Sequence, residues 1–82
     1  MMDLNKYANQ SKYKTLKCLE EGKPKTQTAI AEELGTSQVS ASRKINHLLN
    51  EDCVTEEGMF KGYSITDKGL KLMNLLEEIQ NL

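Results

Sequence analysis

The chain of 82 residues is long enough for one small domain, residues 1–82, and too short for a separate catalytic or ligand-binding domain beside it. Hydrophobic residues make up 38% and charged residues 28%, which excludes a disordered chain, and no apolar run approaches the roughly 18 residues of a membrane span. The net charge of −1 lacks the strongly basic balance that is common in nucleic-acid binders.

Charge is distributed unevenly along the chain. Residues 1–25 contain six Lys and three acidic residues, whereas residues 51–82 contain three Lys and seven acidic residues. This asymmetry permits a local positive surface, which is sufficient for DNA binding. Residues 1–6 lack the apolar core of a secretory signal, so we expect a cytoplasmic protein without membrane association.

Two helical patterns occupy the first part of the chain. In the first, residues 4–20, apolar side chains recur at intervals of three and four, and the Gly-Lys-Pro-Lys segment at 22–25 ends the helix. The second, residues 27–34, follows a capping Thr26 and stops at Gly35.

A third helix is predicted after the capping residues Thr36 and Ser37, and it extends to about Asn50. Ala31 is small enough for a steep helix crossing, and Gly35 supplies the left-handed residue of a short turn. The two helices therefore indicate a helix-turn-helix. The inward positions of the third helix are Ala41, Ile45 and Leu48, with Leu49 at the edge of this stripe.

The opposite face of the third helix carries side chains that suit a DNA major groove about 12 Å wide. Arg can bind a guanine edge, Gln and Asn can bind adenine, Ser can bind bases or phosphates, and Val can contact a thymine methyl group. The alternative is an ordinary helix with a solvated face. The candidates for base contact are Ser37, Gln38, Val39, Ser42, Arg43 and Asn46.

The hydrophobic period changes beyond the third helix. Residues 53–57 and 60–65 alternate as two strands around a two-residue turn at 58–59, because Gly suits the first position of such a turn. A last helix is predicted from the capping Thr66 to the end of the chain at residue 82. The order of helix, helix, helix, hairpin and helix gives an α+β fold class that is mainly α.

The predicted turn fixes a register for the two strands. Val54 is expected opposite Tyr63, and Glu56 opposite Lys61. An apolar pair and a pair of opposite charges across the strands both favour this register.

Three segments of the chain, in order, resemble the MarR-like and ArsR-like winged helix-turn-helix regulators of bacteria and archaea. Residues 31–43, Ala-Glu-Glu-Leu-Gly-Thr-Ser-Gln-Val-Ser-Ala-Ser-Arg, closely resemble their helix-turn-helix. Residues 48–54 resemble the helix exit into the first strand of the wing, and residues 63–69 resemble the second strand and the start of the last helix. The resemblance implies a winged helix-turn-helix fold and DNA binding, although Asp52 stands where these regulators usually have Gly.

The same resemblance implies which polar residues face DNA phosphates. In this fold the N-terminus of the second helix points at the DNA backbone, so residues that precede it are favoured. The wing is short, and Glu56 and Glu57 oppose phosphate contact, so we expect the third helix to be the main DNA-binding element. The candidate phosphate contacts are Lys23, Lys25, Thr28, Lys44 and Lys61.

The last helix, residues 66–82, has more apolar surface than its own core requires, and a seam with three-four-three spacing indicates a dimerisation helix. A two-fold homodimer would present two third helices to half-sites about one DNA turn apart, so the expected DNA partner is an inverted repeat. Core packing within one chain is the alternative for part of this surface. The candidate dimerisation residues are Leu4, Tyr7, Leu72, Leu75, Leu76, Ile79 and Leu82.

The remaining reactive side chains indicate neither an enzyme nor a metal or cofactor site. Cys18 and Cys53 lack metal-ligand spacing, and we interpret them as small half-buried hydrophobic residues, with a redox pair as the alternative. His47, the only histidine, is interpreted as a solvent-exposed helix residue, with a phosphate contact as the alternative.

Two hypotheses of function follow from the sequence. The first is a sequence-specific regulator that binds double-stranded DNA as a homodimer and represses transcription by occlusion. The second is a winged-helix module for protein interaction within a larger assembly, which the low net charge and the acidic wing favour.

Overall fold

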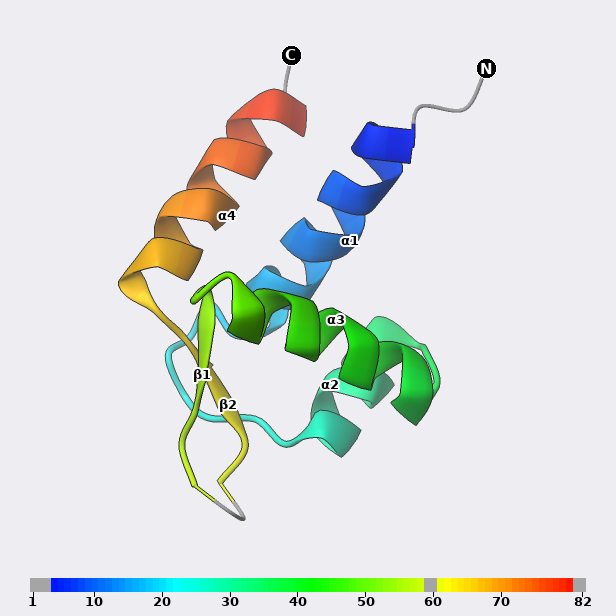
Figure 1. Ribbon diagram of the computed structural model, residues 1–82, viewed down its shortest axis with the longest axis vertical. Helices are drawn as coiled ribbons and strands as arrows, with labels where there is room; N and C mark the ends of the chain where they lie inside the picture. The colour runs from blue at the N-terminus through cyan, green and yellow to red at the C-terminus, as the bar shows by residue number, and fades with distance from the viewer. Residues whose placement is uncertain (1–3, 59–60, 81–82) are drawn as a thin grey trace.

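The computed structural model describes residues 4–58 and 61–80, and it contains four helices and one hairpin within those residues (Figure 1). The elements are α1 (Leu4–Cys18), α2 (Gln27–Leu34), α3 (Gln38–Asn50), β1 (Val54–Glu56), β2 (Tyr63–Ile65) and α4 (Asp67–Gln80). The expected order of elements is confirmed. The first helix ends two residues before the predicted end, because Leu19 and Glu20 form hydrogen bonds of the tighter i to i−3 type instead.

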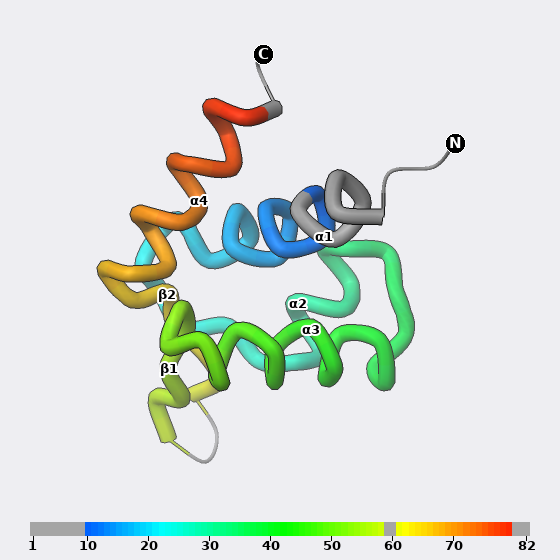
Figure 2. Tube along the Cα trace, turned by 45° about the horizontal axis from the view of Figure 1, so that its top comes forward, coloured from blue at the N-terminus to red at the C-terminus, as the bar shows by residue number. Residues whose placement is uncertain are grey.

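Helices α1 and α4 pack against each other, and α2 packs against α3 (Figure 1). Figure 2 shows α3 and the hairpin at one end of the molecule and the last turns of α4 at the other. The molecule is elongated, with principal extents of 41 × 26 × 20 Å. The surface of α3 and the hairpin is therefore well separated from the surface at the end of α4.

The core lies where the helices and the base of the hairpin meet. Every described element except β2 supplies at least one buried apolar side chain, and the removal of each such side chain from water contributes about 1.5–3 kcal/mol. The core cluster consists of Leu16, Leu19, Ile30, Ile45, Leu48, Cys53, Val54 and Met73. In α3 the predicted inward residues Ala41, Ile45 and Leu48 are all buried, which confirms the period assigned to that helix.

Local caps set the ends of α2 and α3, as predicted. The Thr26 hydroxyl accepts a hydrogen bond from the Ala29 amide, and Gly35 adopts the left-handed conformation at φ 64° after α2. The Ser37 hydroxyl accepts a hydrogen bond from the Ser40 amide at the start of α3. These caps hold the two helices in the steep crossing around Ala31, which is 3% exposed.

Hydrogen bonds join the residues after α3 to the start of α4. Asp52 has φ 61°, so this residue does take the left-handed conformation expected at its position. The Thr66 hydroxyl donates to the Asp52 carbonyl oxygen at 2.6 Å, and the same hydroxyl accepts from the Gly69 amide at 3.0 Å. One threonine side chain thereby joins the α3 exit to the first turn of α4.

The register predicted for the hairpin is wrong by two residues. Val54 pairs with Ile65 and Glu56 pairs with Tyr63, instead of Tyr63 and Lys61 respectively. The pairing continues as Glu57 with Gly62, and the Lys61 amide donates to the Gly58 carbonyl oxygen. Residue 59 of the predicted turn lies outside the described residues.

The shift follows from the turn, because the pair of Glu57 and Gly62 closes a four-residue connection, residues 58–61, instead of the predicted two-residue turn. A contact beyond the hairpin adds a third segment beside β2. Tyr63 exchanges two backbone hydrogen bonds with Lys25, at 2.8 and 2.9 Å, so β2 lies between β1 and the segment before α2. This close approach requires Gly62, because a Cβ at that position would lie 2.1 Å from the Lys25 carbonyl oxygen, and its φ is +94°. Cross-strand preferences within the hairpin carry no information about this third partner.

Candidate nucleic-acid interface

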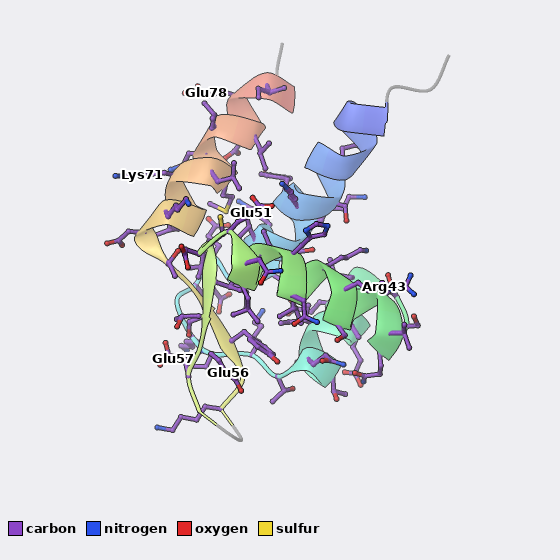
Figure 3. All side chains as sticks on the ribbon, viewed as in Figure 1. Arg43, Glu51, Glu56, Glu57, Lys71 and Glu78 are labelled. Carbon is purple, nitrogen blue, oxygen red and sulfur yellow. The ribbon has the colours of Figure 1, made fainter. Side chains whose placement is uncertain are left out.

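The exposed face of α3 lies opposite its buried stripe. Arg43 and Asn46 are exposed, Val39 is 65% exposed, and Ser37 is exposed at the cap of the helix. Figure 3 shows Arg43 extending from α3 away from the body of the protein. Ser42 is half-buried, so it lies at the edge of this surface.

The charge on α3 is entirely basic. The helix contains Arg43, Lys44 and His47 and no acidic residue. With the acids of residues 4–58 and 61–80, neither Arg43 nor Lys44 forms a salt bridge. The positive charge of α3 is therefore available to an anionic partner even though the chain as a whole is slightly acidic.

Gln38, at the start of α3, is exposed but held by the first turn of α2. The Gln27 Nε2 atom donates to both the Gln38 carbonyl oxygen, at 3.2 Å, and Gln38 Oε1, at 3.1 Å. Gln38 Nε2 donates to Thr28 Oγ1 at 3.1 Å. Two of the predicted DNA contacts, Gln38 and Thr28, are thus brought together.

The two lysines predicted to bind phosphates before α2 differ in whether they already have an acidic partner. Lys23 is exposed, whereas the Lys25 ammonium lies 2.7 Å from a carboxylate oxygen of Glu33. The hydrogen bond from Lys25 holds the pKa of the Glu33 carboxyl below its ordinary value and raises the pKa of Lys25. Lys25 must leave this partner to contact a phosphate, and Lys23 need not.

The hairpin presents acidic side chains near the same surface. Glu56 and Glu57 are both exposed and lie on the first strand side of the hairpin (Figure 3). Glu56 also lines a hollow of about 300 Å³ with Gln27, Thr28 and Tyr63. Lys61 is the exposed base on the other side of the turn. The hairpin is therefore a weaker candidate for phosphate contact than α3.

The geometry of two crossed helices followed by a hairpin agrees with a comparison of the sequence with protein families. The family described as winged helix-turn-helix matches residues 9–82. The chain belongs to the winged helix-turn-helix family. No curated protein matches the chain significantly. The predicted fold class, mainly α with a two-stranded hairpin, is confirmed.

In the terms of this family, α2 and α3 form the helix-turn-helix, and residues 54–65 form the wing. Helix-turn-helix domains typically place the second helix of the motif, here α3, in the DNA major groove.

Two polar residues of this surface were missed by the sequence analysis. Asn50 is exposed and continues the spacing of Val39, Arg43 and Asn46, so the helical period alone could have found it. Gln27 carried no such signal, because its importance depends on its contact with Gln38 across the helix crossing.

The predicted dimerisation residues divide into three groups. Leu75 and Ile79 are 55% and 49% exposed on α4, and Leu72 is half-buried beside them. Leu76 is only 4% exposed because it points into the chain's own core, so it is not available to a partner. The side chains of Leu4 and Tyr7, and residue Leu82, lie outside the described parts of the structure.

The two cysteines are free thiols. Cys53 is buried and Cys18 is half-buried, in agreement with their interpretation as small hydrophobic residues. Burial, together with Glu33, raises the pKa of the Cys18 thiol to about 11, and burial also raises the pKa of Cys53. Both thiols are therefore protonated near neutral pH, which disfavours redox chemistry.

The remaining predictions concern His47, metals and membranes. His47 is exposed, as predicted. Within the described segments, no group of three or more His, Cys, Asp or Glu side chains is placed to hold a metal ion. Among the described helices, none is both long enough and apolar enough to cross a membrane.

Proposed function

We propose that this winged helix-turn-helix protein is a sequence-specific transcription regulator that binds double-stranded DNA with α3 in the major groove. The observation that carries the proposal is the exposed face of α3, which has unpaired basic charge, polar side chains and no acid. An exposed helix face with a cation, polar side chains and no acid has the electrostatic footprint of a DNA-binding element, even in a chain of low net charge.

Each side chain on this face has a chemically suitable target. Arg43 suits a guanine edge, Asn46 and Gln38 suit adenine, and Val39 suits the methyl group of thymine. Ser37 and Ser42 suit a base or a nearby phosphate. These short side chains surround one long one, Arg43, so the helix backbone can approach the floor of the groove.

Backbone contacts would flank the base contacts. Lys23 precedes α2, and Thr28 lies in its first turn. Lys44 is half-buried and lines a hollow with Ser11 and Thr15 of α1, so it would reach a phosphate from the α1 side of α3. Lys25 would also contact a phosphate once it has left its salt bridge with Glu33. Lys61 would add one contact from the wing, against the repulsion of Glu56.

The regulator is proposed to act as a homodimer through α4. Leu75 and Ile79 stand one helical turn apart, so their exposed side chains form one apolar stripe. A two-fold partner would cover this stripe with the same surface. The dimer would place two α3 helices about 34–36 Å apart for an inverted repeat, and it would repress transcription by occlusion, in the manner of MarR-like and ArsR-like regulators.

The test is selection of duplexes from a random pool by the purified protein, followed by binding at several salt concentrations. We expect enrichment of an inverted repeat and an affinity that falls linearly with salt on a double logarithmic scale. Absence of enrichment, together with no salt-dependent binding to any duplex, would contradict the proposal.

A second candidate function rests on the acidic wing. Exposed Glu56 and Glu57 suit a protein partner better than a phosphate backbone. In that case the chain would serve as a winged-helix interaction module within a larger assembly. The same salt titration distinguishes the two, because an interaction module would show no affinity for duplex DNA.

A further inference from the structure

Three polar side chains link the first turns of α2 and α3 on the surface that is proposed to face DNA. Gln27 and Thr28 belong to α2, Gln38 belongs to α3, and the three hydrogen bonds among them measure 3.1 to 3.2 Å. Thr28 and Gln38 are exposed and Gln27 is half-buried. Gln27 therefore lies behind Gln38 rather than beside it at the surface.

The pattern of donors and acceptors fixes the orientation of both amide groups. The backbone carbonyl oxygen of Gln38 can only accept, so the Gln27 atom that faces it must be the amide nitrogen. The same nitrogen faces the Gln38 side chain, and the atom that it meets must be an oxygen, Oε1. The Gln38 nitrogen is then the atom that faces Thr28 Oγ1.

Gln38 retains hydrogen-bonding capacity after these contacts are made. A glutamine amide has two N–H donors and two acceptor sites on its oxygen, and the network uses one of each. One donor and one acceptor remain. This pair matches the major-groove edge of adenine, where N7 accepts a hydrogen bond and the N6 amino group donates one.

We infer that Gln27 and Thr28 are positioning residues that hold Gln38 in the orientation that recognises an adenine at one fixed position of the DNA site. The inference rests on the proposed function and adds to it the identity of one base and the residues that determine this preference. The physical basis is preorganisation, because a long side chain that is already ordered loses less entropy on binding.

Arg43 offers a contrast on the same helix. It forms no salt bridge within the described residues, whereas Gln38 is held at both ends of its amide group. The two residues therefore recognise bases in different ways. Arg43 becomes ordered on binding, and Gln38 is ordered beforehand.

The first arm of the test examines the free protein. Gln27→Met keeps the length of the side chain and removes its amide oxygen and nitrogen, and Thr28→Val removes the hydroxyl at nearly constant shape. By NMR, we expect the Gln38 side-chain NH2 group of the native protein to be ordered, and its order parameter to fall in both variants. Gln10→Met, an exposed site on α1, is the matched control. An NH2 group that is equally mobile in all four proteins would overturn the inference.

The second arm measures preference among bases, which a merely structural role would not change. On the selected DNA site, Gln38→Ala should lower the preference for adenine over the other bases at one position by about 5- to 150-fold. Gln27→Met should lower the preference at the same position by about 2- to 10-fold. The double variant should show the same loss as Gln38→Ala alone, because Gln27 acts only through Gln38.

The outcomes separate this inference from the proposed function. Selective binding by the native protein, with a Gln27→Met loss that is equal on all sequences, overturns the inference and leaves the proposed function intact. A loss of preference in the double variant that exceeds that of Gln38→Ala also overturns it. If the native protein selects no DNA sequence, both the inference and the proposed function are contradicted. Unchanged melting temperatures in the variants show that altered preference is not a folding defect.

Discussion

The exposed faces of α3 and α4 differ in chemistry although the two helices are similar in length. Each buries one apolar stripe in the same core. On the opposite side, α3 shows a single apolar residue, Val39, among polar and basic groups, whereas α4 shows Leu75 and Ile79 one turn apart. A single exposed apolar side chain is ordinary, but two that adjoin form a patch that favours a protein partner.

The core determines where each helix lies, and the exposed face that remains determines what the helix can bind. Helix α3 and the last turns of α4 lie toward opposite ends of the molecule (Figure 2). A partner on α4 would therefore leave α3 free. The proposed dimer and the proposed DNA contact are compatible for this reason, because they use different helices.

The largest expected effect comes from charging the apolar face of α4. The double variant Leu75→Glu/Ile79→Glu should give folded monomers, because both side chains are exposed and contribute little to the core. Loss of the second half-site contact should lower DNA affinity by about 100-fold or more. Sedimentation and duplex binding measure the two effects.

Asn74→Glu is the matched control for this variant, since it adds a charge to an exposed position of the same helix. The dimer proposal fails if the native protein sediments as a monomer at micromolar concentration. It also fails if the double variant binds DNA as tightly as the native protein.

The next effect tests the polar face. Arg43→Ala should weaken binding to the preferred site by about 1–3 kcal/mol and relax preference at one base pair, because a guanine edge loses its bidentate partner. Lys71→Ala removes an exposed cation from α4 and should change neither quantity. An equal loss on every sequence would reassign Arg43 to a phosphate.

A smaller effect distinguishes two lysines that the sequence treated alike. Lys23→Ala should reduce the slope of affinity against salt by about one unit, since an exposed cation releases one counterion equivalent on binding. Lys25→Ala should reduce the slope by less than Lys23→Ala, because the native Lys25 must leave Glu33 before it can contact a phosphate. Unchanged slopes for both variants would remove this segment from the interface, and a reduced slope for Lys25→Ala alone would show that DNA displaces Glu33.

The smallest effect concerns the wing. Glu56→Gln should raise affinity for all duplexes by about two- to fivefold, because one negative charge is removed beside the phosphates without a change in shape. Glu78→Gln, on the outer side of α4 (Figure 3), is the control for net charge. Equal gains in the two variants would indicate that only the total charge matters and that the wing stands away from the DNA.

The sequence predicted most of the features that depend on local interactions. Thr26 and Ser37 cap helices through their own neighbouring amides, and Gly35 and Asp52 take left-handed conformations that their chemistry permits. Each of these features depends on fewer than six consecutive residues. Helix α2 consequently has the predicted bounds.

Features that depend on distant parts of the chain were not predictable in the same way. Tyr63 of the wing pairs with Lys25, which is 38 residues earlier in the chain. The role of Gln27 follows from the angle at which α2 crosses α3, and the burial of Leu76 follows from the packing of α4 against α1. In all three cases, the residue type is evident from the chain alone, and the tertiary contact decides its role.

The glycine at position 62 limits how the wing could be redesigned. A library that randomised residues 56–63 and retained only folded proteins would return glycine at 62, since any side chain there collides with the backbone at Lys25. Glu57 and Lys61 face solvent on either side of it and carry no such restriction. Engineers could therefore reverse the charge of the wing freely while its attachment to the helix-turn-helix stayed fixed.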